Sequence, residues 1–204
     1  MPGAFRTGPE QDRLAAAMTA LAGQFGAAGF AAVEPAHLFP AETLLDLYGE
    51  DIRTRAFLFP DPGAGRELCL RPDFTVPVAR GHALGGWDRA GAYAYGGPVF
   101  RRQEPGSVRP IEYLQAGVES FGVEDRPGED ARIFALVSAG LTALGAGPVT
   151  VQTGDLGIIF ALLDGLEMPE ARRAELRRHL WRPARFHALI EAALAASRAA
   201  GPRR

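Results

Sequence analysis

An amide, a glycine and a carboxylate alternate along one predicted strand and could together form the floor of a binding site. Side chains in a strand alternate between its two faces, so Gln115, Gly117 and Glu119 share one face of the strand predicted over residues 111–121. The amide and the carboxylate lie about 13 Å apart, and the glycine between them would let a ligand rest against the backbone. The alternative is that Gln115 and Glu119 only face solvent on a half-exposed sheet.

A second polar pair, Asp73 and Thr75, follows Arg71 and Pro72 where a predicted strand passes into a predicted helix. A carboxylate at such a junction could hold the ammonium group of a ligand. Asp and Thr are also common caps of helix N-termini, and Thr75 is expected to be the N-cap of the helix over residues 75–83. The residues alone leave both roles open.

Three arginines lie in or beside the loop predicted over residues 101–110. Arginine recognises phosphate and carboxylate groups through its planar guanidinium. Arg101 directly follows a strand, so the backbone positions it well, whereas Arg102 and Arg109 lie within the loop and could be ordinary surface charges. A loop this long and this charged between two strands is more typical of a binding loop than of a spacer.

The sequence lacks the residue patterns that several other kinds of chemistry need. The four histidines are scattered without metal-ligand spacing, and the sequence contains no P-loop, GxSxG or GxGxxG motif. Neither a metal nor a cofactor is therefore expected. Cys69 is the single cysteine, which excludes a disulfide scaffold. Because it lies in an apolar strand, we expect it to be buried rather than nucleophilic.

The composition is that of a folded protein without a strongly charged partner. The chain has 204 residues, of which 47% are apolar, and 22 arginines against 24 acidic residues give a net charge of −2. No apolar run approaches the roughly 20 residues of a membrane helix, and the N-terminus lacks the apolar block of a signal peptide. We therefore expect a cytoplasmic protein with no membrane partner, and nucleic acid is an unlikely partner at this charge.

The elements that must position these residues are strands in hairpins with helices between them. Apolar residues at helical spacing predict a first helix that follows Pro9 and ends at Gly26 and Gly29. The pattern favours an α+β fold with an antiparallel sheet over a doubly wound parallel sheet. The other predicted elements are an extended segment at 33–35, a short helix at 43–48, a hairpin of 56–59 with 67–70, a hairpin of 92–100 with 111–121, a helix at 128–144, a strand at 148–153, a helix ending at 163 and a helical tail at 169–200.

The helix predicted over residues 128–144 carries its apolar side chains on one stripe, which is typical of a helix packed on a core. The best candidate domain boundary follows residue 166. It separates a domain over residues 1–166 from a helical segment over residues 167–204. The stripe consists of Ile133, Phe134, Val137, Leu141 and Leu144.

Three segments of the chain resemble class II aminoacyl-tRNA synthetases. YGGPVFRRQ at residues 95–103 and EYLQAGVESFG at residues 112–122, with Arg109 between them, are similar to motif 2 of histidyl-tRNA synthetases and their paralogues. LRPDFT at residues 70–75 resembles the amino-acid-binding segment of the same enzymes. The resemblance extends over roughly residues 14–166.

The resemblance is closer to the paralogues of these enzymes, the regulatory subunits of ATP phosphoribosyltransferase. Asp73 stands where the synthetases usually have Glu, and Gln103 stands where their motif 2 loop has Glu. The run LLDLYGEDIR at residues 44–53 also favours the paralogue. The synthetases' later histidine-specific segment, their motif 3 and their anticodon-binding domain have no counterpart in the sequence.

The resemblance implies the class II core fold, an antiparallel sheet flanked by helices, truncated before motif 3. It implies a homodimer formed through the region around Glu34 and Pro35. Asp73 and Gln115 would face the ammonium group of histidine, and Glu119 would face its imidazole. The residues that match histidine-binding positions are Asp73, Thr75, Gln115 and Glu119, and those that match anion- or phosphate-binding positions are Arg101 and Arg109.

The function that the resemblance implies is regulatory rather than catalytic. The chain would activate the short catalytic subunit of ATP phosphoribosyltransferase, in the first step of histidine biosynthesis, and would mediate feedback by histidine. An activation site without motif 3 lacks groups that the transition state needs together, so we expect no adenylate formation. The alternatives are a fragment of a histidyl-tRNA synthetase, which activates histidine with ATP, and a synthetase-like module that senses an amino acid.

Overall fold

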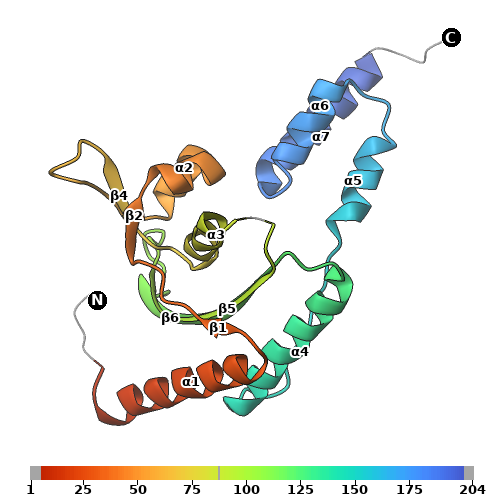
Figure 1. Ribbon diagram of the computed structural model, residues 1–204. Helices are drawn as coiled ribbons and strands as arrows, with labels where there is room; N and C mark the ends of the chain where they lie inside the picture. The colour runs from red at the N-terminus through yellow and green to blue at the C-terminus, as the bar shows by residue number, and fades with distance from the viewer. Residues whose placement is uncertain (1–5, 87, 200–204) are drawn as a thin grey trace. The chain divides into compact units, whose positions relative to one another are not determined.

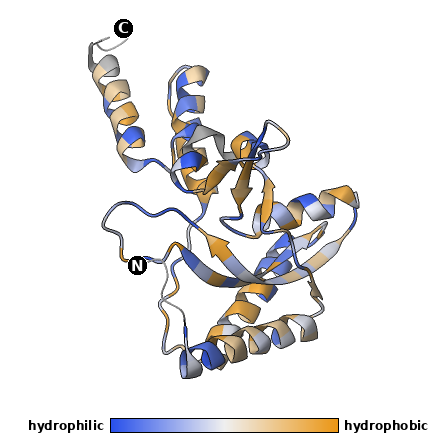
Figure 2. Ribbon diagram, turned by 90° about the vertical axis from the view of Figure 1, so that its left-hand side faces the viewer, coloured by the Kyte–Doolittle hydropathy of each residue, from blue (hydrophilic) through white to orange (hydrophobic). Residues whose placement is uncertain are grey.

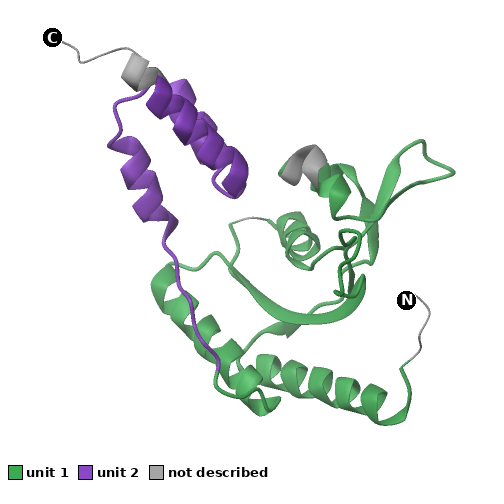
Figure 3. Cartoon of the chain, turned by 180° about the vertical axis from the view of Figure 1, so that it is seen from behind, with its two compact units in different colours: residues 1–148 green, residues 149–204 purple. Residues whose placement is uncertain are grey.

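The computed structural model describes residues 6–86 and 88–199. The chain divides into two compact units, Met1–Pro148 and Val149–Arg204, which are coloured separately in Figure 3. The boundary that the sequence indicates after residue 166 lies inside the second unit, between the helices α5 (Leu156–Asp164) and α6 (Glu170–Arg178).

A three-stranded sheet forms the centre of the first unit (Figure 1). Strands β5 (Gly91–Phe100) and β6 (Glu112–Phe121) pair antiparallel along their whole length, which confirms the predicted long hairpin. The prediction of an antiparallel sheet holds for β5 and β6 but not for strand β1 (Ala31–Ala32), which pairs with β5 in parallel. Two alanines are too short a segment to show the alternation that identifies a strand in a sequence.

Helices cover both faces of this sheet. Helix α1 (Gly8–Ala27) and helix α4 (Arg126–Ala143) lie on one face, and α3 (Thr75–Leu84) lies on the other (Figure 1). Gly29 has a φ of +89°, a conformation that favours glycine, directly after the end of α1. The first helix therefore ends where the glycines predict. The face toward α1 and α4 is lined by the small residues Ala94, Ala116 and Val118, and the face toward α3 by Tyr93, Tyr95, Val99, Tyr113 and Phe121.

A second, smaller sheet packs against the helix α2 (Glu42–Tyr48) and the 3-10 helix η1 (Gly49–Thr54). Its strand order is β2 (Leu38–Pro40), β4 (Glu67–Leu70), β3 (Leu58–Pro60), and both pairings are antiparallel. The β3–β4 hairpin confirms the prediction, whereas β2 is an additional strand. The core of this part of the unit consists of Ala41, Leu44, Ile52, Ala56, Cys69 and Val76.

The side of helix α4 that packs on the core differs from the apolar stripe that its sequence predicts. Ile133 and Leu136 pack against the core, and a Cβ on Gly140 would lie 3.0 Å from the side chain of Leu21 in α1. The glycine lets α1 approach closely, so it sets which side of α4 is packed. The prediction of a buried stripe is wrong for Phe134, Val137, Leu141 and Leu144, which are 40–54% exposed. Figure 2 shows apolar residues along the helices of the chain.

The second unit consists of α5, α6 and α7 (Pro183–Ala199). The strand predicted over residues 148–153 does not form, and Val149 and Val151 are 56% and 53% exposed. A strand needs a partner to satisfy its backbone, and within the described ranges no strand pairs with this segment. Among the described residues, no helix is both long and apolar enough to span a membrane.

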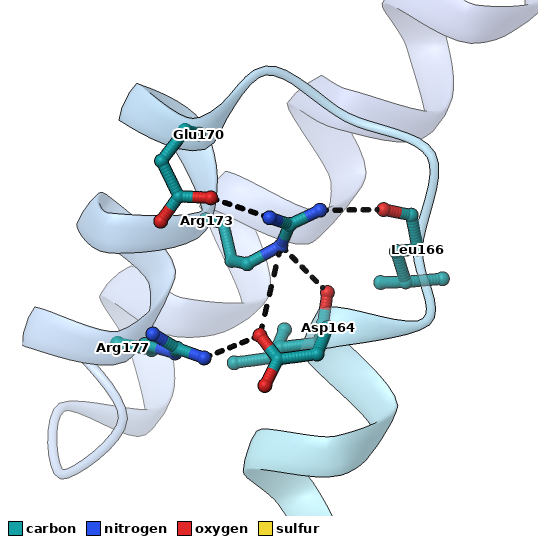
Figure 4. A network of polar contacts seen from close by, with 6 residues as sticks. Asp164, Leu166, Glu170, Arg173 and Arg177 are labelled. Carbon is teal, nitrogen blue, oxygen red and sulfur yellow. Dashed lines mark hydrogen bonds and ion pairs between the residues drawn. The ribbon is translucent and has the colours of Figure 1, made fainter.

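Arginines of α6 attach this helix to the end of α5 (Figure 4). Arg173 donates hydrogen bonds to the backbone carbonyls of Leu163 and Leu166, each at 3.0 Å, and pairs with Glu170. Arg177 pairs with Asp164, the last residue of α5. The carbonyls at a helix C-terminus lack partners within the helix, so the guanidinium of Arg173 satisfies part of this need.

Candidate functional site

The phenol of Tyr95 lies among the residues that match histidine-binding positions. The hydroxyl of Thr75 donates to Glu119 Oε1 at 2.7 Å, and the hydroxyl of Tyr95 approaches the same oxygen at 3.3 Å. The side chain of Gln115 hydrogen-bonds the phenol, and the charge of Asp73 acts on it. The fold thus brings the four residues together from two segments of the chain, around a phenol that belongs to a third.

The environment of Tyr95 keeps its hydroxyl protonated. Burial raises the pKa of Tyr95 to about 12, and the negative charges of Glu119 and Asp73 act in the same direction. Ionising the phenol would place a negative charge in a buried position next to two carboxylates. Tyr95 therefore remains a hydrogen-bond donor throughout the physiological pH range.

The position of Tyr95 depends on the glycine opposite to it in the hairpin. Tyr95 and Gly117 are register partners, and a Cβ on Gly117 would lie 2.5 Å from the Tyr95 hydroxyl. The ring stacks on Phe74, with ring centres 4.4 Å apart and planes 8° from parallel. The space over Gly117 is thus filled by Tyr95, which corrects the interpretation that this glycine opens the backbone to a ligand.

The role of Thr75 also differs from its prediction. The N-cap of α3 is Phe74, which offers no side-chain cap, and Thr75 is the first residue of the helix. The Thr75 hydroxyl is used for Glu119 instead of capping the helix. Asp73 Oδ1 is buried and has no hydrogen-bond partner among the described residues, so it could accept a hydrogen bond from a ligand.

Arg71 holds the segment that carries Asp73 and Thr75. Its side chain donates to the carbonyl of Pro98 in β5 at 2.8 Å and to that of Pro35 at 2.6 Å. Its guanidinium also lies over the ring of Phe74, 4.0 Å from the ring centre. Burial lowers the pKa of Arg71. Sequence reasoning noted this residue only as part of a motif and missed its place in the core.

A pocket of about 880 Å³ adjoins this cluster and shares Asp73 with it. Arg101 lines the pocket, donates to the carbonyl of Pro72 at 2.7 Å and lies 5.5 Å from the ring centre of Tyr113. Arg109 is exposed on the loop. An excess of guanidinium groups suits a ligand with a phosphate or carboxylate. The charged residues of the lining are Arg55, Arg101, Arg102, Arg109, Asp73 and Glu104.

The part of the chain that the structure describes contains no group of three or more histidine, cysteine or acidic residues able to hold a metal ion. Cys69 is fully buried, as predicted, and its thiol donates to the carbonyl of Phe39 at 3.4 Å. Burial raises the pKa of Cys69 to about 11, so the thiol is a poor nucleophile.

Comparison with known proteins is consistent across sequence and structure. The family model described as histidyl-tRNA synthetase matches residues 4–200. A protein of Chelativorans sp. (strain BNC1), named ATP phosphoribosyltransferase regulatory subunit, is 40% identical over 152 residues, which are 74% of this chain and 40% of that protein. A protein of Brucella ovis with the same name is 38% identical over 140 residues, 68% of this chain and 36% of its own length.

A solved structure from Bacillus halodurans extends the similarity to almost the whole chain. It is described as an ATP phosphoribosyltransferase regulatory subunit/histidyl-tRNA synthetase and superposes with a TM-score of 0.74 at 27% identity, covering 93% of this chain and 50% of its own. The fold is thus that of class II synthetase-like proteins. The chain spans 40% or less of the length of the two curated relatives above.

Proposed function

The chain belongs to the histidyl-tRNA synthetase family, and from this premise we propose that it is the synthetase-like part of an ATP phosphoribosyltransferase regulatory subunit. The observation that carries the proposal is the name of its relatives at 40% and 38% identity. In this role the chain catalyses no reaction itself. It joins a short catalytic subunit, activates it, and makes the complex responsive to histidine.

The cluster around Tyr95 supports histidine as the ligand. Glu119 and Asp73 offer carboxylate oxygens to the imidazole N–H and to the ammonium group, and the adjoining Arg101 offers a guanidinium to the carboxylate. Histidine could instead bind at a subunit interface. Glu119→Ala should weaken histidine binding in calorimetry, and an unchanged affinity would point to the interface.

Feedback requires that histidine prefers one state of the complex. A ligand shifts an equilibrium only by the difference between its affinities for the two states. By the same linkage, the catalytic subunit must change the affinity of the chain for histidine by an equal factor. Calorimetry of histidine with the chain alone and with the complex measures this factor.

The main alternative is that the chain forms part of a synthetase that activates histidine with ATP. Gln103 stands in the pocket where the synthetases carry Glu, and adenylate formation depends on several charged groups positioned together. We therefore expect no histidine-dependent exchange of pyrophosphate into ATP. Exchange above the no-enzyme background would reject the regulatory role in favour of the synthetase.

Association with a catalytic subunit tests the proposal directly and separates it from a free-standing amino-acid sensor. A tagged chain co-expressed with a short ATP phosphoribosyltransferase subunit should purify as one complex of fixed stoichiometry. If the two proteins elute separately at micromolar concentration, the regulatory role is rejected.

The chain is further proposed to form a homodimer through the region around Glu34 and Pro35, in the cytoplasm where its pathway operates. Both residues line a pocket of about 380 Å³, and Glu34 is exposed. Light scattering should then give twice the chain mass of 21.7 kDa. Glu34→Arg should reduce that mass toward the single chain, and the exposed Glu124→Arg should not.

A further inference from the structure

Tyr95 is the one residue of the cluster that matches no ligand position assigned from the sequence. We propose that Tyr95 is a positioning residue that fixes Glu119 as the acceptor for a ligand N–H, and so selects a side chain of the imidazole type. This inference rests on the proposed histidine site and names the residue that makes the site selective.

The hydrogen bonds around the phenol have only one consistent direction. Glu119 Oε1 receives both the Thr75 and the Tyr95 hydroxyls, because a carboxylate oxygen has two lone pairs and can accept two donors. Because the Tyr95 hydrogen points to Glu119, the phenol oxygen can only accept from Gln115. The Gln115 NH₂ group is therefore turned toward Tyr95, and its carbonyl oxygen is left to accept from an ammonium group.

The same arrangement leaves a defined acceptor for the ligand. Both hydroxyls, of Thr75 and of Tyr95, go to Oε1 of Glu119, so neither occupies its second carboxylate oxygen, Oε2. Asp73 Oδ1 is buried without a partner in the described part of the chain. The ammonium group of any amino acid can donate to Asp73, whereas only a ring N–H can donate to Glu119. The site therefore rejects an isosteric side chain that lacks an N–H, because the Glu119 oxygen would lose its donor.

The packing around Tyr95 holds its ring in one place, so that its hydroxyl can fix the carboxylate of Glu119. Tyr95 is 8% exposed, and its ring is stacked on Phe74 with planes 8° apart. On its other side the ring lies over Gly117, where no side chain could fit without displacing the hydroxyl. The phenol therefore has one position, and it fixes the carboxylate of Glu119 in turn.

Two matched substitutions on the same strand separate this role from a general effect on the fold. Tyr95→Phe keeps the stacked ring and removes only the hydroxyl that reaches Glu119. Tyr93→Phe removes a hydroxyl from the register partner of Glu119, but that hydroxyl contacts the buried His82 at 3.0 Å instead of the carboxylate. The probes are histidine and β-(2-thienyl)alanine, which keeps the ammonium and carboxylate groups but has no ring N–H.

Calorimetry on the full chain should show that Tyr95→Phe weakens histidine binding about tenfold, the loss expected for one hydrogen bond to a charged acceptor. The affinity for thienylalanine should change little, so the ratio of the two affinities falls. Tyr93→Phe should leave that ratio unchanged even if it lowers stability. Gly117→Ala, which pushes the phenol away without removing it, should reproduce the loss of selectivity.

Three results would overturn the inference. If Tyr95→Phe binds histidine as the unmodified chain does, the hydroxyl does not position Glu119. If Tyr95→Phe weakens both ligands equally, its role is structural and not selective. If the unmodified chain binds no histidine, the proposed histidine site itself fails, and the inference falls with it.

Discussion

Arg71 is 1% exposed, and no carboxylate accepts a hydrogen bond from its guanidinium in the described part of the chain. Backbone carbonyls of Pro35 and Pro98 and the face of Phe74 take that place. A buried charge without partners is strongly destabilising, so these contacts are what make its burial possible. Arg71 therefore ties the 33–35 segment and β5 to the residues that carry the candidate site.

Removing this guanidinium should destabilise the first unit strongly. Arg71→Leu removes the donor from two partly buried carbonyls, and we expect a loss of about 2–4 kcal/mol in the free energy of unfolding. Arg66→Leu removes an exposed pair with Asp61 and should cost less than about 1 kcal/mol. Urea unfolding of both variants measures the difference. Equal losses would show that Arg71 does not hold these segments together.

The single cysteine offers a direct test of the core around β4. With its pKa raised to about 11 by burial, roughly one Cys69 thiol in a thousand is ionised at pH 8, against about one in ten for an ordinary thiol of pKa 9. A thiol reagent such as DTNB should therefore react with the folded chain far more slowly than with the chain in urea. A rate equal to that of the unfolded chain would place Cys69 outside the core.

The sequence led to the candidate site residues through the resemblance rather than through their pattern. Strand alternation alone could not decide whether Gln115 and Glu119 face solvent or a ligand, because it does not show what covers a sheet face. Tyr95 was missed because its importance appears only in the register with Gly117. A large aromatic opposite a glycine in a predicted hairpin was the available signal. That the four residues bind histidine stays a prediction.

At the scale of elements, the length of a helix or strand decided whether it could be predicted from the sequence. The long hairpin and the first helix carry enough residues for periodicity to identify them, whereas β1 and β2 have two and three residues and depend on pairing with β5 and β4. The segment at 148–153 shows the opposite case. It has the alternation of a strand but no partner strand within the described residues.

The first turn of α4 gives a prediction for the pH dependence of stability. Glu129 has a pKa lowered to about 2, mainly by its hydrogen bonds with Arg132 and also by one with Ser120. A lowered pKa in the folded chain contributes stability above the ordinary value of 4.5, and this contribution is lost as pH falls from 4.5 toward 2. The effect should be small because Arg132 is exposed and solvent screens the pair.

The unfolding free energies of the unmodified chain and Glu129→Gln should therefore differ at pH 6, and most of this difference should be lost by pH 2.5. Urea unfolding at a series of pH values checks this. The exposed Glu124→Gln is the control and should show no such convergence. A difference for Glu129→Gln that stays constant down to pH 2.5 would mean that the Arg132 pair does not stabilise the charged carboxylate.

At the scale of the molecule, the family likeness and the site lead to the same account. The fold places the residues that match histidine-binding positions of the family around one phenol, and an arginine-lined pocket lies beside them. Such an arrangement can bind a small zwitterion without performing chemistry on it. Regulation then follows if binding of the zwitterion and association with a catalytic subunit are linked.

The rate of a short ATP phosphoribosyltransferase subunit, measured with and without the chain, tests this account most directly. We expect the chain to raise the rate of product formation from ATP and phosphoribosyl pyrophosphate, and histidine to lower the rate of the complex. A catalytic subunit whose rate is the same in the presence and absence of the chain, at concentrations where the two would associate, would contradict it.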